Sequence, residues 1–226
     1  MKTGNKTYGK LCDLPKQIPV FPLSGALLLP GGQLPLNIFE PQYIEMFNDA
    51  LAGNKLIAMM QPLREVSEEE KFTGTYPKMY KVGCVGRITA WQESGDGRYL
   101  VNLSGICRYS ILAKIDDTKN YQTYEVEYFE TDLKEPDKHA DVDRKKLLAT
   151  FRDYLDANQM DADWESVEET DTNQLVNALC MMSPYGPAEK QAMLEAGNIA
   201  LRAETLIAIT EIELAKTAGN PGGGLQ

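Results

Sequence analysis

The stretch LPLNIFEPQYIEMF, residues 34–47, decides how the first half of the chain folds, because its hydrophobic period changes part-way along. Its first part is an extended apolar run that indicates a strand, carried by Leu34, Leu36, Ile38 and Phe39. Pro41 then suits the first position of a helix, where a missing N–H costs no hydrogen bond. Proline also moves the residue before it, Glu40, out of the α region. The stretch therefore predicts a strand, a hinge at Glu40 and a helix that begins at Pro41.

The predicted helix carries Ile44, Phe47 and Leu51 on one face and ends at Gly53. Glu40 stands beside the helix N-terminus, which favours negative charge. A partly buried carboxylate usually also has a cationic partner. We therefore expect Glu40 to be structural rather than catalytic. Its expected partners are backbone N–H groups at the helix start or an arginine from a strand-like segment: Arg87, Arg98 or Arg108.

The remainder of the first half reads as β structure. Prolines interrupt the apolar pieces of residues 18–39, which predicts short or edge strands, because proline cannot donate to a sheet ladder. Further strand-like segments occupy residues 55–62, 82–93, 98–115 and 121–130. Between two of them SGDG, residues 94–97, supplies the glycines of a hairpin turn.

The hydrophobic period becomes helical after residue 130, and the fold class predicted is α+β. Helical stripes include Leu148, Phe151 and Leu155, with Asp141 or Asp143 as a cap, and then Leu175, Val176, Leu179 and Cys180. The expected boundaries are a flexible N-terminus at 1–16, a β domain at 17–130, a linker at 131–141, a helical bundle at 142–217 and a flexible tail at 218–226.

Charge separates the same two halves. The 226 residues carry a net charge of −10. Residues 1–129 hold 14 acidic and 14 basic side chains, whereas residues 130–226 hold 19 acidic and 9 basic ones. Because nucleic-acid-binding surfaces are basic, this composition argues against a nucleic-acid partner. No apolar run reaches the roughly 18–20 residues of a membrane helix, and no secretory signal is apparent. We expect a cytoplasmic protein without membrane contact.

The sequence contains no motif that carries catalysis. Neither a G-x-S-x-G elbow nor a G-x-x-x-x-G-K-[ST] phosphate loop occurs. His139 is the single histidine, and the four cysteines are widely spaced, so a zinc site is disfavoured. We therefore predict no catalytic residue, no metal ligand and no cofactor. A small hydrolase that uses a Ser–Lys pair or carboxylates stays open as the alternative.

Aromatic residues offer a route to binding. Core packing explains most of them, but those on a solvent face near proline-broken edges could hold an extended peptide by strand addition. The candidate peptide contacts are Tyr43, Trp91, Tyr99, Tyr124 and Tyr128.

Several motifs resemble one known family in the same order along the chain. They are IPVFPLSGALLLPGGQLPLNIFEPQYIEMFNDAL, VGCVGRI, GDGRYLVNLSGICRYSI and EKQAMLEA, which together span about residues 17–214. The family is that of the substrate-binding N-terminal domain of Lon proteases and its stand-alone relatives. Gln42 departs from the arginine that the family usually has after Glu-Pro, and CRYSI, residues 107–111, replaces a more usual R-F-R-I.

The resemblance implies a twisted, mostly antiparallel β domain of about six strands with one helix, followed by a helical bundle. Lon proteases continue into ATPase and Ser–Lys protease modules, and this chain ends before either. The function implied is therefore binding without catalysis, with unfolded polypeptide or another protein as the partner. Such a module could act as an adaptor in proteolysis or quality control, or as an assembly platform for a dedicated folded partner.

Overall fold

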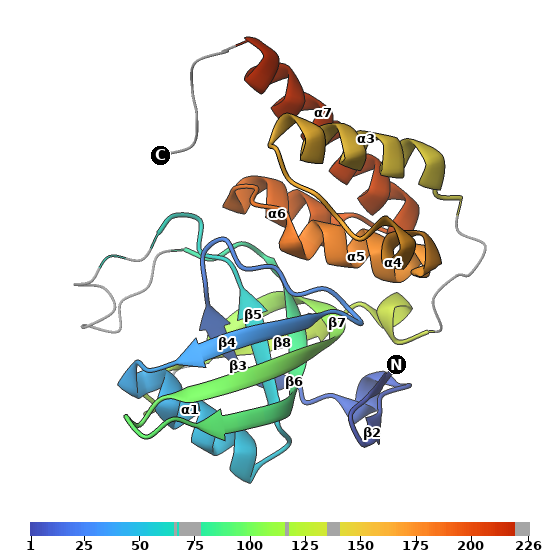
Figure 1. Ribbon diagram of the computed structural model, residues 1–226. Helices are drawn as coiled ribbons and strands as arrows, with labels where there is room; N and C mark the ends of the chain where they lie inside the picture. Colours follow the sequence, from blue (N-terminus) through green and yellow to red (C-terminus); the bar gives the residue numbers. More distant parts are fainter. Residues whose placement is uncertain (66, 68–77, 116–117, 135–140, 220–226) are drawn as a thin grey trace.

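The computed structural model describes residues 1–65, 67, 78–115, 118–134 and 141–219 (Figure 1). His139, the linker residues 135–140 and the tail residues 220–226 lie outside the described residues. The strands are β1 (Lys2–Thr3), β2 (Lys6–Thr7), β3 (Gln17–Pro22), β4 (Gln33–Ile38), β5 (Leu56–Met60), β6 (Val82–Glu93), β7 (Tyr99–Ile115) and β8 (Gln122–Tyr128). The helices are η1 (Leu11–Asp13), α1 (Pro41–Ala52), η2 (Glu130–Leu133), α3 (Arg144–Ala157), α4 (Trp164–Glu169), α5 (Thr172–Met182), α6 (Pro187–Glu195) and α7 (Ile199–Gly219).

Six strands form one sheet in the order β4-β7-β6-β5-β3-β8. The long strand β7 pairs with β4 through residues 99–104 and with β8 through residues 109–115. Because β8 also pairs with β3, five strands close into a ring and β4 stays at an edge. All pairings in this sheet are antiparallel except that of β3 with β5. The expected mostly antiparallel sheet is confirmed, and bulges in β6 and β7 help to bend it.

The strand-to-helix change in the opening stretch is confirmed. β4 ends at Ile38, and α1 begins at Pro41 after an extended Glu40 with φ −75° and ψ 132°. Gly53 follows the last helical residue. The buried face is shifted by one residue toward the N-terminus relative to the expected stripe. Ile44 and Leu51 are only partly buried, and Phe47 is the expected residue that is fully buried. The side chains that α1 buries are Tyr43, Met46, Phe47 and Ala50.

The helical unit, which we define as α3 to α7, lies on the opposite side of the sheet from α1 (Figure 1). Aspartates start three of its helices: Asp143, Asp163 and Asp171 each accept a hydrogen bond from a backbone N–H in the first turn. The predicted stripe of α5 is buried in full, namely Leu175, Val176, Leu179 and Cys180. No strand occurs among the described residues after Tyr128.

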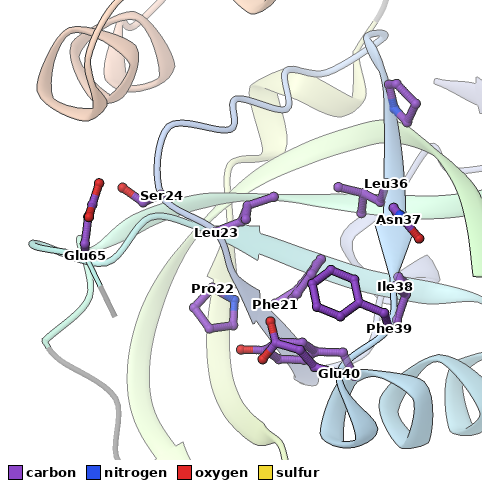
Figure 2. A pocket seen from close by; sticks show the side chains of 12 residues that line it. Phe21, Pro22, Leu23, Ser24, Leu36, Asn37, Ile38, Phe39, Glu40 and Glu65 are labelled. Carbon is purple, nitrogen blue, oxygen red and sulfur yellow. The ribbon is translucent and has the colours of Figure 1, made fainter. Parts of the chain in front are cut away.

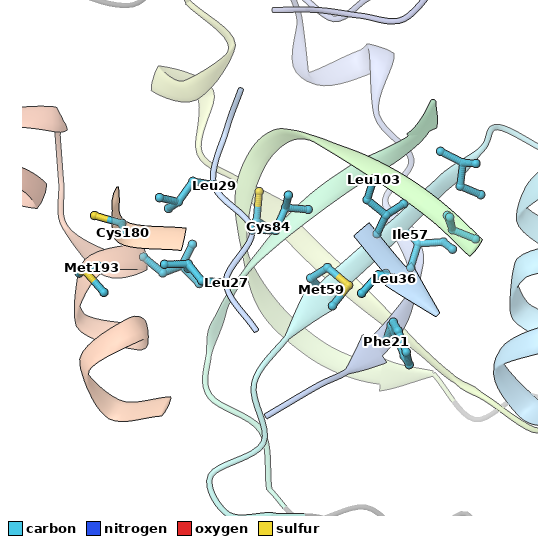
Figure 3. Close-up of a cluster of buried hydrophobic side chains, with 14 of the residues drawn as sticks. Phe21, Leu27, Leu29, Leu36, Ile57, Met59, Cys84, Leu103, Cys180 and Met193 are labelled. Carbon is cyan, nitrogen blue, oxygen red and sulfur yellow. The ribbon is translucent and has the colours of Figure 1, made fainter. Parts of the chain in front are cut away.

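The sheet and the helical unit share one hydrophobic core. Leu27 and Leu29, from the loop between β3 and β4, lie between sheet residues and the helical unit's Cys180 and Met193 (Figure 3). Figure 3 shows Cys84 and Leu103 on the sheet side of that loop. A core that runs across both units holds them together by apolar burial. The domain boundaries expected from the sequence, 17–130 for the β domain and 142–217 for the helical bundle, stay a prediction.

The N-terminal residues correct one expectation. We expected residues 1–16 to be flexible, yet they form a small hairpin whose Tyr8 is fully buried against the sheet. The Tyr8 hydroxyl accepts a hydrogen bond from Arg87 at 3.2 Å. The amino group of Met1 donates to the carbonyl of Leu133 at 3.3 Å. The buried Tyr8 ring and these hydrogen bonds together attach the segment to the sheet.

Candidate polypeptide-binding groove

A groove of about 450 Å³ lies between the end of β3 and the length of β4. One wall consists of residues 21–24, at the end of β3 and in the loop that follows. The other wall consists of residues 35–40, from β4 to the start of α1, with Tyr43 and Glu65 completing the lining. Figure 2 shows Phe21, Pro22 and Leu23 along the first wall and Leu36 to Glu40 along the second.

The groove owes its shape to the position of β4 at the sheet edge. Among the described strands, β4 pairs with β7 alone, so its other side has backbone groups without a strand partner. Pro35 fits such an edge because it has no N–H to contribute to a ladder. Leu36 and Ile38 point into the core, while Asn37 and the next aromatic residue, Phe39, are exposed. An open strand edge beside an apolar hollow is therefore the central feature of the site.

Aromatic rings form the deep part of the groove. Phe21 and Tyr43 contact each other edge to face, with ring centroids 4.4 Å apart. Both rings are buried, and they join the groove lining to the hydrophobic core. Phe39 differs from them, since 55% of its surface is exposed and the guanidinium of Arg98 lies 5.7 Å from its ring centre. An exposed phenylalanine on a concave apolar surface is typical of a contact for a partner.

Glu40 corrects a second expectation. Its carboxylate accepts a hydrogen bond from the side-chain amide of Gln42 at 2.8 Å and does not cap α1. No salt bridge joins it to Arg87, Arg98 or Arg108, all of which lie in the described part of the chain. The ion pair expected from the sequence is therefore wrong. Glu40 is half-buried on the groove wall, so water can stabilise its charge without an arginine.

The three arginines have other partners. Arg108 forms a buried ion pair with Asp132 at 2.8 Å, and Arg98 forms an exposed pair with Asp96 at 2.9 Å. Arg87 donates to Tyr8 and to two further groups, the side chain of Asn5 and the carbonyl of Asn54. The signal missed in the sequence is Asp132, which stood in the expected linker but lies in η2 against β7.

Arg108 also joins the two units. Besides Asp132, its guanidinium donates to the carbonyls of Leu194, at 3.1 Å, and of Ala196 and Gly197 at the end of α6. The last carbonyls of a helix have no partner within it and carry partial negative charge. A buried cation that fills this position links β7 to α6. The role of Arg108 is therefore structural.

The five residues expected to contact a peptide lie at three different places in the structure. Tyr43 lines the groove, where it is a buried core residue as well. Trp91 is half exposed and contacts Tyr99 with ring centroids 6.0 Å apart, next to Phe47 of α1. The tyrosines of β8 pack on the other side of the sheet, where Tyr124 donates to Gln122 and Tyr128 donates to the carbonyl of Pro15. Their role in peptide contact stays a prediction.

The ionisable groups of the groove do not form a catalytic set. Glu40 and Glu65 are the charged residues among the described lining, which contains Ser24 but neither lysine nor histidine. Three of the four cysteines are buried, and burial raises the pKa of the Cys107 and Cys180 thiols to about 12. A protonated thiol is a poor nucleophile. Within the described residues, no group of three or more metal-ligating side chains occurs, and no helix is long and apolar enough to cross a membrane.

The comparison with protein families decides the identity of the fold. The model of the ATP-dependent protease La (LON) substrate-binding domain matches residues 17–211. The chain belongs to the LON substrate-binding domain family. The match includes the closed sheet, both groove walls and most of α7.

Relatives are similar to the chain over most of its length. Lon protease 1 of Hydrogenovibrio crunogenus is 27% identical over 198 residues, covering 86% of this chain and 24% of that protein. The Lon protease of Parabacteroides distasonis is 29% identical over 203 residues, covering 87% of this chain and 24% of that protein. The chain thus spans about a quarter of the length of these Lon proteases.

Two solved structures share the fold. A Lon N-terminal domain protein from Xanthomonas campestris aligns with a TM-score of 0.60 and 19% identity over 85% of this chain and 97% of that one. The N-terminal domain of a Mycobacterium avium complex Lon protease aligns with a TM-score of 0.56 and 19% identity, over 87% and 98%. The α+β architecture is therefore that of Lon N-terminal domains.

Proposed function

We propose that this protein is a non-catalytic polypeptide-binding module that holds an extended segment of an unfolded chain along β4. One observation carries the proposal: the edge of β4 that has no partner among the described strands forms a wall of the apolar groove. A bound segment would extend the sheet by backbone hydrogen bonds and place an apolar side chain between Phe21 and Phe39. Family membership supports the same class of partner, because the family is named for substrate binding.

The binding should be weak. Ordering a disordered segment costs about 2–5 kcal/mol of the interaction energy, and Pro35 removes one backbone donor from the edge. Weak, sequence-tolerant binding suits an adaptor in proteolysis or quality control, which must release its clients. A dedicated folded partner is the rival assignment, and it would need a larger buried surface than this groove offers.

The test is a titration of a labelled, permanently unfolded protein with the purified chain and with a Phe39→Ser variant. We expect saturable binding, weakened about tenfold in the variant, since a central aromatic contact contributes at least ~1.4 kcal/mol. Leu112→Ser is the matched control, because Leu112 is also exposed, at 59%, but does not line the groove. Equal affinities for the two variants would place the binding elsewhere.

Catalysis is tested on the same preparation. We expect neither ATP hydrolysis nor cleavage of an unfolded substrate, because the described groove lining holds a serine and two carboxylates but no histidine or lysine to activate the serine. Saturable proteolysis that persists through repurification, and is lost on Ser24→Ala, would favour the small hydrolase instead.

A further inference from the structure

A second cavity, of about 570 Å³, lies within the helical unit. Side chains from α3, α5 and α7 line it, together with the segments that follow α3 and α5. Its walls are largely apolar and include Phe151, Leu179 and the rings of Tyr154 and Tyr185, whose centroids are 6.2 Å apart. The volume is large enough for a leucine or an aromatic side chain and its neighbours.

The polar groups of this cavity are largely satisfied and uncharged. The hydroxyls of Tyr185 and Thr210 are hydrogen-bonded to each other at 2.8 Å. Burial first, and then the negative charge of Glu213, raise the pKa of Tyr154. Tyr185 is shifted in the same direction, again chiefly by burial. Among the described lining residues, Asp161 is the one with a charged side chain. The interior therefore suits an apolar group, with charge recognised only at the mouth.

The segment that supplies Met160, Asp161 and Ala162 to the lining is acidic. The segment from Asp153 to Asp171 contains eight acidic residues and no basic one. Glu213 is near enough to act on the two tyrosines. Two lysines of α3 and α7 are in ion pairs, Lys146 with Glu211 at 3.0 Å and Lys216 with Glu213 at 3.2 Å. The guanidinium of Arg152 is stacked 4.2 Å over the ring of Trp164.

Two methionines project beside the cavity. Met182 is 81% exposed, and Met160 is 46% exposed. Methionine is unbranched and polarizable, so it adapts to apolar partners of different shape. Exposed methionines around an apolar hollow are typical of surfaces that bind varied segments.

We propose that this cavity is a second polypeptide site, which takes a large apolar side chain from a segment with lysine or arginine on either side of it. The proposal rests on the polypeptide-binding function and names the class of segment that the helical unit selects. The apolar walls bind the central side chain, while Asp161 and the surrounding acids attract the flanking cations. A segment flanked by glutamate would meet like charge at the mouth and be rejected.

The experiment uses two labelled peptides with the same leucine-rich centre, one flanked by lysines and the other by glutamates. We expect the lysine peptide to bind about tenfold more tightly, a difference of ~1.4 kcal/mol, and high salt to reduce that preference. Met182→Ser should weaken the lysine peptide severalfold. The matched control is Leu201→Ser, because Leu201 is 48% exposed on α7 but does not line the cavity. Asp161→Lys should narrow the difference between the two peptides without unfolding the protein.

The Phe39→Ser variant separates this proposal from the groove. Binding of the lysine peptide that is lost in Phe39→Ser and kept in Met182→Ser would overturn the second site and leave the proposed function intact. Equal affinity for the two peptides would likewise overturn it. Failure of both peptides and of the unfolded protein to bind at all would overturn the proposed function itself.

Discussion

The groove of the sheet unit and the cavity of the helical unit are similar in size but differ in what they can recognise. The groove has the edge of β4 as one wall, and no other described strand pairs with that edge, so it presents backbone groups. The cavity is walled mainly by helices, whose backbone groups are already bonded within each helix, and by the segments that follow α3 and α5. No strand edge borders it among the described lining residues. The first site therefore favours tolerance of sequence, and the second favours selection.

Charge reinforces this difference. The half that contains the groove is neutral overall, whereas the half that contains the cavity carries the whole net charge of −10. Both linings carry acidic side chains, Glu40 and Glu65 in the groove and Asp161 in the cavity, so the difference in selection by charge that we infer comes from the net charge of the surrounding half. Under the two proposals, capture of a segment belongs to the sheet unit and selection belongs to the helical unit, which requires that contacts hold the two units together.

The largest expected effect concerns the contact between the two units, which we call the joint. Its polar part is Arg108 of β7 with Asp132 and with the carbonyls at the end of α6. Arg108→Ala leaves the largely buried Asp132 carboxylate without its cation, with the backbone N–H of residue 108 still donating to it, and removes the link to the end of α6. We expect the free energy of unfolding to fall by about 3–5 kcal/mol, the cost of removing one member of a buried ion pair. Denaturant unfolding followed by circular dichroism measures it.

The control for Arg108→Ala is Arg98→Ala. Arg98 also pairs with an aspartate, Asp96, but both side chains are more than half exposed, at 53% and 56%. We expect a loss of about 0–1 kcal/mol there. Equal stabilities for the two variants would mean that the joint between the units depends on apolar contacts alone.

The sequence was sufficient for most of the architecture. Pro41 and Gly53 bracket a helix because the fixed φ of proline and the conformational freedom of glycine act locally, and the alternation of β8 predicts a strand because it too is a local pattern. Closure of the sheet was not predictable in this way. It depends on β7 pairing with two strands, β4 and β8, along one edge. These pairings are long-range, and the hydrophobic period of a segment contains no information about them.

The site was less predictable than the fold. Glu40 and the arginines all lie in the predicted elements, yet partner choice depends on distances that sequence spacing does not contain. Asp132 was missed because η2 was read as part of a linker. Phe39 did carry a signal: it follows the buried Ile38 directly and so breaks the alternation of β4, which leaves an apolar ring in solvent.

A smaller effect is expected at Gly105 of β7, which faces the loop between β3 and β4. A Cβ at Gly105 would clash with the carbonyl oxygen of Leu29, in the segment that joins the two units. We expect Gly105→Ala to cost about 1–3 kcal/mol, as overpacking does. Gly95→Ala is the control, since nothing lies within 4 Å of a Cβ there. Thermal melts compare them. A melting temperature for Gly105→Ala equal to that of Gly95→Ala would show that the loop at Leu29 moves aside at little cost in stability. The two units would then be less firmly coupled than we infer.

The smallest effect is expected at the groove wall itself. Glu40→Ala removes a single hydrogen bond, from Gln42 at 2.8 Å, on a half-buried surface. We expect a loss of about 0.5–1.5 kcal/mol, the usual net contribution of one hydrogen bond, rather than the cost of breaking a buried ion pair. Gln42→Arg should turn the same contact into a charge-assisted pair and raise the free energy of unfolding slightly. Because residue 40 lines the groove and residue 42 does not, only Glu40→Ala should also change the affinity for unfolded polypeptide. A loss of 3 kcal/mol or more in Glu40→Ala would return Glu40 to the structural role that the sequence suggested, and would make the groove wall part of the framework instead of part of the site.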